Sequence, residues 1–355
     1  MNSPQVIVIG GGVIGCASAY ALAREGVPVV VLEKDHIAAH ASGGAAGILS
    51  TLDDEPGSPD AALNSASLAL HPVYAERLRE ETRIDVEYQR AGTLTLLEGG
   101  VTPAVRPGQQ LLNRAELLEL EPAVGPVWTG AVFQTGDGQV NAGRLTRALA
   151  EGAARRGAEI CEGRIAQELL VDGGRVRGVR TPDGEIRAEH VVLAAGPWSL
   201  RFSSPSLPIP LIPTKGEILW VKTRPQALRR PIFAGHYLVP KPTIGLAVGA
   251  TYRQDGFNEI PALGAVAELA ATALRAVPSL AAAAFSRMWS SIRPIPADGR
   301  PILGPVLGME GLIVATGHGA YGIALSLVTG ELVRDWVLGR PISLDVSVFS
   351  PGRFL

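Results

Sequence analysis

The chain has 355 residues, of which 46% are hydrophobic and 19% charged, and its formal net charge is −2. This length corresponds to about two domains of ~150 residues, and the apolar content is too high for a disordered chain. The balanced charge gives no sign of nucleic-acid or membrane-surface binding, and two cysteines are too few for a disulfide framework or a cysteine-rich zinc site. We therefore expect no metal, nucleic-acid or membrane partner and a reducing, cytoplasmic compartment.

Two uncharged runs, residues 6–23 and 312–330, approach the length of a membrane span. Each run contains four glycines, which suit a strand, a turn and a helix better than a lipid-facing helix. We therefore predict a strand–turn–helix unit in both places.

The first unit predicts a dinucleotide-binding βαβ motif. A short β-branched run at residues 5–10 reads as a buried strand, residues 13–25 as a helix and residues 27–32 as a second strand. The turn between the first strand and the helix has the spacing GxGxxG, from Gly10 to Gly15.

Each glycine of that spacing, and the acidic residue after the second strand, has a physical role. Gly10 permits the tight turn, Gly12 lets a diphosphate approach the backbone, and Gly15 lets helix and strand pack closely. Glu33 ends the second strand, where a carboxylate accepts hydrogen bonds from a ribose hydroxyl and disfavours the 2′-phosphate of NADP. The motif does not decide whether the bound dinucleotide is NAD or FAD.

A run of small residues at 41–47 follows, with Ser42 as a hydroxyl donor. Such a run packs little core, and it suits a backbone that passes closely along a large flat ligand, which favours FAD. The alternative interpretation is a surface loop.

Together with five later segments, these motifs carry a family resemblance. The later segments are 139–144, 191–199, 292–304, 315–323 and 349–354. In this order the chain resembles the flavin-dependent amino acid oxidases of the D-amino acid oxidase superfamily, and most closely the bacterial glycine oxidases. The resemblance implies an α/β fold with an FAD-binding Rossmann-like domain of the glutathione-reductase type and a second, mostly antiparallel-sheet substrate domain.

The resemblance also implies a discontinuous domain arrangement. The FAD-binding domain is expected to take residues 1–82, 134–203 and 296–355, and the substrate domain residues 83–133 and 204–295.

Local patterns predict four elements of the substrate domain. Residues 93–97, 217–221 and 246–249 read as strands, and residues 262–277 as a helix that ends at Pro278.

Two residues are expected to bind the substrate. The resemblance places Arg293 at the family's carboxylate-binding arginine, and a guanidinium binds a carboxylate through two parallel hydrogen bonds. It also places Tyr237 where the family has a tyrosine whose hydroxyl reaches the same carboxylate. Without the resemblance, a surface arginine and a packed strand aromatic are the alternatives.

The resemblance extends to the sarcosine oxidases, which attach their flavin covalently to a cysteine just before the arginine segment. Residues 288–291 contain no cysteine, so FAD is expected to bind here without a covalent link. His318 is expected to belong to the flavin loop rather than to act as a base, because hydride transfer to flavin N5 removes no proton from carbon. The full set of expected FAD contacts is Gly10, Gly12, Val13, Ile14, Gly15, Glu33, Lys34, Ala41, Ser42, Ala46, Gly47, Ile48, Ile165, Ala195, Gly196, Gly317, His318, Gly319, Ala320, Tyr321, Gly322 and Ile323.

One position departs from the glycine oxidase pattern. Those enzymes tend to carry an arginine in the loop near the substrate, where this chain has Ala320. This difference weakens the case for glycine itself and gives room for a larger or N-substituted amino acid.

The expected activity is the FAD-dependent oxidation of a small amino acid, such as glycine, sarcosine or a small D-amino acid, to an oxo acid, ammonia and hydrogen peroxide. One alternative is a dehydrogenase of the D-amino acid or hydroxyproline type that passes electrons to a quinone or a partner protein. Others are a non-catalytic flavin subunit and an NAD-dependent dehydrogenase. A catabolic or a thiamine-precursor role and a homo-oligomer are all compatible with the sequence.

Overall fold

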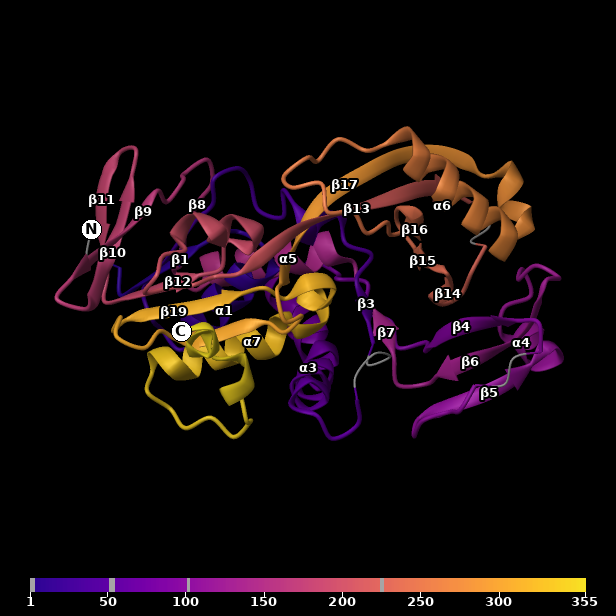
Figure 1. Cartoon of the computed structure of the whole chain (residues 1–355), viewed down its shortest axis with the longest axis horizontal. Helices are drawn as coiled ribbons and strands as arrows, with labels where there is room; N and C mark the ends of the chain where they lie inside the picture. The colour runs from indigo at the N-terminus through magenta and orange to yellow at the C-terminus, as the bar shows by residue number, and fades with distance from the viewer. Residues whose placement is uncertain (1–3, 51–54, 101–102, 224–226) are drawn as a thin grey trace.

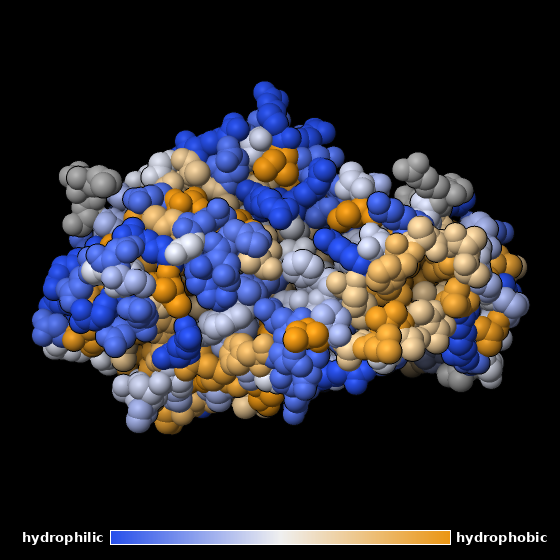
Figure 2. Space-filling model, turned by 90° about the horizontal axis from the view of Figure 1, so that it is seen from above, coloured by the Kyte–Doolittle hydropathy of each residue, from blue (hydrophilic) through white to orange (hydrophobic). Residues whose placement is uncertain are grey.

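The computed structural model describes residues 4–50, 55–100, 103–223 and 227–355. The molecule is elongated in both views (Figures 1 and 2), with a helix-covered sheet in one half and a second, larger sheet in the other (Figure 1). The mixed α/β architecture with a mostly antiparallel second sheet is the fold class expected from the sequence.

A six-stranded sheet forms the centre of the first half. Its strands, in spatial order, are β18 (Ile302–Pro305), β19 (Leu312–Thr316), β12 (His190–Leu193), β1 (Val6–Ile9), β2 (Val29–Leu32) and β8 (Glu159–Cys161). All neighbours pair in parallel except β18 and β19. Parallel strands are buried on both faces, which explains why these segments read as continuous apolar runs.

Alternate residues of β1 and β2 enter two different cores. Val6 and Val8 pack with the helices on one face, whereas Ile7 and Ile9 pack with a small antiparallel sheet on the other. The helices are α1 (Val13–Arg24), α3 (Pro59–Thr82), α5 (Ala142–Arg155) and α7 (Gly322–Val337). The small sheet consists of β9 (Glu168–Asp172), β10 (Arg175–Thr181) and β11 (Gly184–Arg187).

The sequence reasoning missed α3 and the small sheet. In α3 the local signals are present: Ser58 is the N-cap and accepts a hydrogen bond from the backbone N–H of Ala61, and Pro59 starts the helix. Its periodicity is weak because polar residues and Pro72 interrupt the apolar face.

The second sheet has eight strands and carries the wall of the site. In spatial order they are β17 (Ala284–Pro296), β13 (Leu211–Lys222), β16 (Gly245–Gly249), β15 (His236–Lys241), β14 (Ile232–Ala234), β4 (Thr93–Glu98), β6 (Trp128–Gln134) and β5 (Gln109–Asn113). Only β14 and β4 pair in parallel. The expected strands at 93–97, 217–221 and 246–249 all lie in this sheet.

The remaining elements are short or cover the second sheet. The helix expected at 262–277 is α6 (Leu263–Ala276), which ends before Pro278. The others are α2 (Ala41–Gly44), α4 (Arg114–Leu120), the strand pair β3 (Ile48–Leu49) and β7 (Gly138–Gln139), and the 3-10 turns η1 (Gly196–Phe202), η2 (Pro278–Ala282), η3 (Gly319–Tyr321), η4 (Ser347–Phe349) and η5 (Pro351–Phe354).

Among the described residues, no helix is both long and apolar enough to cross a membrane. Both glycine-containing runs instead form the expected strand–turn–helix units, β1–α1 and β19–η3–α7. Cys16 is buried in α1, whereas Cys161 is only partly buried on the edge strand β8.

Candidate active site

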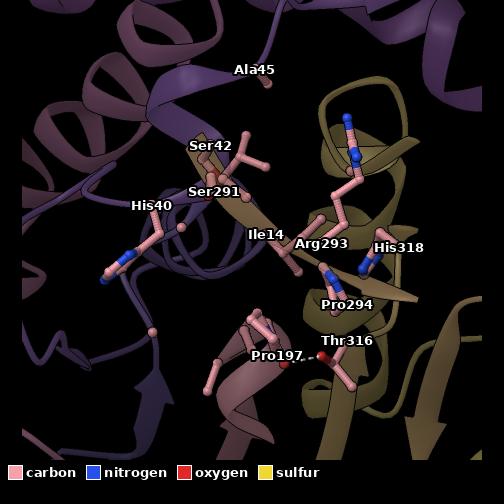
Figure 3. Close-up of a pocket in the computed structure, with 18 of the residues that line it drawn as sticks. Ile14, His40, Ser42, Ala45, Pro197, Ser291, Arg293, Pro294, Thr316 and His318 are labelled. Carbon is pink, nitrogen blue, oxygen red and sulfur yellow. Dashed lines mark hydrogen bonds between the residues drawn. The ribbon is translucent and has the colours of Figure 1, made fainter. Parts of the chain in front are cut away.

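One cleft of about 1630 Å³, its open mouth included, runs between the two halves of the molecule. It is lined by the turn before α1, by α2 and the residues after it, by the ends of β12 and β19, and by β13, β15 and β17 of the second sheet. Figure 3 shows side chains from these segments surrounding one space, with Ser42 and Ala45 from the α2 region and Ser291 and Arg293 from β17.

The turn before α1 has no room for side chains. Gly10 has a φ of 111°, and a Cβ there would lie 2.5 Å from the carbonyl oxygen of Ala194. A Cβ at Gly15 would lie 2.0 Å from the carbonyl oxygen of Gly10, so Gly15 lets α1 pack on the turn. Gly12, the N-cap of α1, provides no side-chain cap, and the hydroxyl of Ser42 instead accepts a hydrogen bond from the backbone N–H of Val13 at 2.9 Å.

Glu33 is 7% exposed and lines the cleft. One carboxylate oxygen accepts from the backbone N–H of Gly11 at 2.6 Å, and the other accepts from that of Asp35 at 2.8 Å. Each oxygen has a second lone pair, so the carboxylate can also accept from a ribose hydroxyl.

A polar cluster lies beside Glu33. The ligand atoms of Glu33, Asp35 and His40 lie within 4.8 Å of one another, a spacing that could hold a metal ion. The ammonium group of Lys34 already hydrogen-bonds to Asp35 and to His40, and it lies 4.3 Å from the ring centre of Trp198. Since Lys34 already binds Asp35 and His40, and backbone N–H groups bind Glu33, the cluster gives no reason to add a metal.

Arg293 projects from β17 into the cleft. Its Nη1 donates to the backbone carbonyl of Thr251 at 3.1 Å. A Cβ added at Gly216, on the neighbouring strand β13, would lie 2.3 Å from the guanidinium carbon. The guanidinium therefore lies flat against a strand where only glycine leaves space for it.

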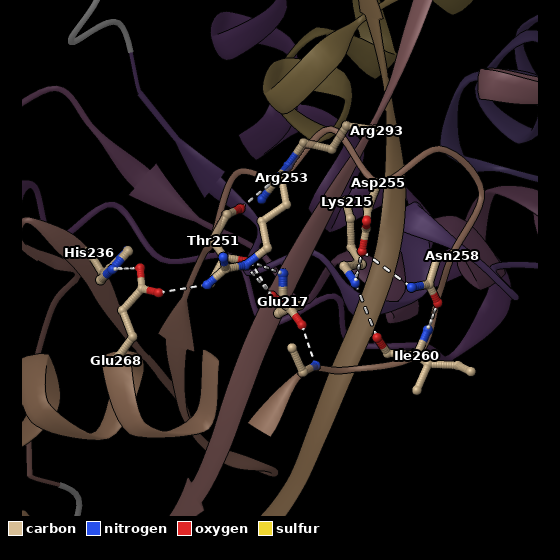
Figure 4. Close-up of polar contacts among 11 residues, drawn as sticks. Lys215, Glu217, His236, Thr251, Arg253, Asp255, Asn258, Ile260, Glu268 and Arg293 are labelled. Atoms are coloured by element: carbon tan, nitrogen blue, oxygen red, sulfur yellow. Dashed lines mark hydrogen bonds and ion pairs between the residues drawn. The ribbon is translucent and has the colours of Figure 1, made fainter. Parts of the chain in front are cut away.

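The carbonyl that holds Arg293 is itself fixed by a buried carboxylate (Figure 4). Glu217 is 0% exposed and accepts hydrogen bonds from the hydroxyl of Thr251 at 2.7 Å, from Arg253 Nε at 3.2 Å and from the backbone N–H of Ala262 at 2.6 Å. Burial opposes ionisation, but these hydrogen bonds together lower the pKa of Glu217 below its ordinary value. A charged acceptor thus anchors the segment that positions Arg293.

Tyr237 lies on β15 in the same wall of the cleft. Burial raises the pKa of its phenol to about 12, although the nearby guanidinium of Arg293 acts in the opposite direction. The hydroxyl is therefore protonated at neutral pH and can donate to a carboxylate.

His318 is buried in the loop after β19, and its Nε2 lies 3.0 Å from the hydroxyl of Thr329. Burial lowers the pKa of His318 to about 3, so the imidazole is neutral and a very weak base at physiological pH. This environment suits a neutral hydrogen-bonding residue.

The two buried histidines should make the protein less stable in mild acid. Burial lowers the pKa of His318 to about 3 and that of His71 to about 4, whereas an unfolded histidine titrates near 6.5. Between those values the unfolded chain binds more protons, so the free energy of unfolding falls as pH decreases from about 7 toward 4. Between pH 8 and pH 5 we expect a loss of about 2 kcal/mol for each histidine, measured by urea unfolding of the apoprotein.

A variant pair isolates one of these contributions. His71→Gln should reduce the pH dependence by about 2 kcal/mol, and His36→Gln, at an exposed position, is the control for the loss of any histidine. An equally steep pH dependence in both variants would contradict the assignment.

The structure brings nearly all the expected site residues to this cleft, including Arg293 and Tyr237. Two expected FAD contacts do not line it. Gly15 packs against the carbonyl of Gly10 and therefore supports the turn without facing the cleft. Tyr321 is 36% exposed on η3. Residues that the sequence reasoning did not select also line the cleft, among them Gly11, His40, Trp198, Gly216, Ile218, Trp289 and Ser291.

The shape and polarity of the cleft fit FAD. At one end the glycine turn leaves backbone N–H groups at the start of a 12-residue helix open to a diphosphate. In the middle, the indole Nε1 of Trp289 is buried without a hydrogen-bond partner among the described residues, and a Cβ at Gly44 would lie 1.7 Å from it. At the other end are Arg293 and Tyr237.

Comparisons with known proteins agree with this geometry. The family model "FAD dependent oxidoreductase" (DAO) matches residues 5–336. A glycine oxidase of Geobacillus kaustophilus (strain HTA426) is 35% identical, over 99% of this chain and 97% of the relative. The crystal structure of glycine oxidase from Geobacillus kaustophilus superposes with a TM-score of 0.93 at 34% identity and covers 99% of both chains.

A second kind of relative has a longer chain. The "Bifunctional protein ThiO/ThiG" of Trichormus variabilis is 32% identical over 99% of this chain, which spans 55% of that protein. The resemblance to the flavin-dependent amino acid oxidases, the fold class and FAD as cofactor are thus confirmed. The chain belongs to the DAO family of FAD-dependent oxidoreductases.

Proposed function

We propose that this protein is an FAD-dependent oxidase that deaminates a small amino acid, with glycine and sarcosine as the first substrates to test. The overall reaction converts the amino acid, oxygen and water into an oxo acid, ammonia (methylamine in the case of sarcosine) and hydrogen peroxide. The observation that carries the proposal is the Arg293 guanidinium, which faces an FAD-shaped cleft beside the protonated hydroxyl of Tyr237. The oxidase names of the relatives support oxygen as the acceptor over the dehydrogenase alternative.

Arg293 and Tyr237 hold the substrate carboxylate, which fixes the position of the α-carbon next to it. FAD, when bound, supplies a two-electron acceptor that oxygen can reoxidise. Among the described lining residues near Arg293, His318 is a very weak base and Tyr237 stays protonated, so no side chain there is suited to take a proton from carbon. This supports hydride transfer from the α-carbon of an amino acid whose amine is already neutral.

Several finer statements belong to the same proposal. The expected FAD contacts that line the cleft hold the cofactor without a covalent link, and Glu33 binds its ribose. The two domains follow the two sheets, although Leu207 and Ile209 pack with the first sheet and favour a boundary near residue 210 rather than 203. The homo-oligomer, the cytoplasmic location and the thiamine-precursor role, which the ThiO-type relatives support, stay predictions.

An anaerobic experiment tests the proposal. Glycine, sarcosine, D-alanine and D-proline are mixed separately with the purified FAD-loaded protein without oxygen, and the flavin absorbance is followed. We expect at least one of them to bleach the flavin, and admission of air to restore the colour with release of hydrogen peroxide. Bleaching that persists in air would indicate a dehydrogenase, and no bleaching by any amino acid would contradict the proposal.

A further inference from the structure

One wall of the cleft contains a buried hydroxyl with no assigned role. Trp289, Ser291 and Arg293 alternate along β17 and all line the cleft, because side chains two residues apart share one face of a strand. Ser291 is 7% exposed, and its Oγ has no hydrogen-bond partner among the described residues. Buried polar groups are normally satisfied, and because Ser291 also lines the cleft, its hydroxyl can bind a partner that enters there.

The register of the sheet places this hydroxyl close to the carboxylate-binding group. Ser291 on β17 pairs directly with Gly216 on β13, and directly paired antiparallel residues have Cα atoms about 4.5–5.5 Å apart. The guanidinium of Arg293 lies flat against that same Gly216. Ser291 is therefore within the length of a small amino acid from the fork of Arg293.

The side chains around Ser291 differ in whether they donate or accept hydrogen bonds. The guanidinium of Arg293 and the indole of Trp289 are donors only, and the protonated Tyr237 is directed to the carboxylate together with Arg293. A neutral substrate amine also carries N–H groups that need an acceptor once they leave water. The Ser291 oxygen is an acceptor on the same face of β17, two residues from the carboxylate anchor.

We propose that Ser291 determines substrate specificity by accepting a hydrogen bond from the substrate amine. This inference rests on the proposed function, because it assumes that Arg293 holds the carboxylate of an amino acid. It distinguishes amine-bearing carboxylates from carboxylates of similar size that lack an amine.

The test compares Ser291→Ala with Ser290→Ala. Ser290 is the adjacent serine; its Oγ is also buried without a partner among the described residues, but it does not line the cleft. For Ser291→Ala we expect kcat/KM for glycine and sarcosine to fall about 2- to 12-fold, the range of one neutral hydrogen bond. The Kd of acetate, followed by the change in flavin absorbance, and the Kd of FAD should stay at the wild-type values. Ser290→Ala should match the wild type in all of these.

Other outcomes would overturn the inference, and each would assign the Ser291 hydroxyl a different role. An equal loss of acetate and glycine binding would place the hydroxyl on the carboxylate, and a weaker FAD complex with unchanged substrate kinetics would place it on the cofactor. Equal effects of the two serine variants would indicate a general effect on the strand. If no amino acid reduces the wild-type flavin, the proposed function itself has failed. Flavin reduction in the wild-type protein therefore distinguishes this failure from a failure of the Ser291 inference.

Discussion

Arg293→Ala should weaken the binding of carboxylate ligands by about 10- to 150-fold, which corresponds to the roughly 1.5–3 kcal/mol of a charge-assisted hydrogen-bond pair. The guanidinium lines the cleft together with Tyr237 and can form two parallel hydrogen bonds to a carboxylate. The measurements are the Kd of acetate, from flavin absorbance, and kcat/KM for the amino acid that reduces the flavin best. The Kd of FAD should change little, because Arg293 stands on β17 and hydrogen-bonds to Thr251 rather than to the glycine turn before α1.

Two further variants sharpen this result. Arg187→Ala removes an exposed arginine of β11 that pairs with Glu185 outside the cleft, and it should leave carboxylate binding unchanged. Gly216→Ala places a methyl group where the guanidinium of Arg293 lies, and because that guanidinium ends a flexible side chain, the protein should still fold. We expect about a tenfold loss of carboxylate affinity. An Arg293→Ala variant with wild-type acetate binding would show that another residue binds the carboxylate.

Gly15→Ala should remove most FAD binding and destabilise the apoprotein. The new methyl group would lie 2.0 Å from the backbone carbonyl oxygen of Gly10, and since neither group is at the end of a flexible side chain, α1 must move away from the turn. Overpacking of this kind costs about 1–3 kcal/mol of the free energy of unfolding, and the displaced helix no longer directs its N–H groups at the diphosphate. We expect at least a tenfold increase in the Kd of FAD, measured by quenching of flavin fluorescence.

Two controls separate packing from a direct effect on the cofactor. Gly264→Ala, in the exposed part of α6 where a Cβ meets nothing within 4 Å, should keep wild-type FAD binding and stability. Gly12→Ala would meet only the hydroxyl of Ser42, at 3.3 Å, so it should fold normally and still weaken FAD binding. Full FAD affinity in both Gly15→Ala and Gly12→Ala would contradict a diphosphate site at this turn.

The nucleotide half of the fold follows closely from local signals. A β-branched run, a glycine turn and a helix of regular length specify β1, α1 and β2 almost without tertiary information. The small antiparallel sheet was missed because its strands β9 and β11 are partly exposed and rich in charged residues, which leaves little apolar alternation to read.

The site could be predicted only in part, because several of its residues are brought together by the pairing and packing of distant strands. The resemblance selects Arg293 and Tyr237, but Gly216 and Ser291 owe their position to the pairing of β13 with β17, two strands far apart in the sequence. Strand periodicity places Trp289, Ser291 and Arg293 on one face, yet which face meets the cleft is decided by how the sheet packs on the first half. Sequence spacing alone carries no such information.

The parallel pairing of β4 with β14 has a consequence for biosynthesis. Leu94 of β4 faces Ile232 of β14, and α5, β8, β12 and the small antiparallel sheet of the other half are translated between them. On the ribosome, β4, β5 and β6 can pair early, but the inner border of that three-stranded piece has no partner until β14 emerges. Unpaired borders of this kind recruit other chains. We therefore expect the nascent protein to depend on chaperones during this interval, and slower translation there to favour aggregation.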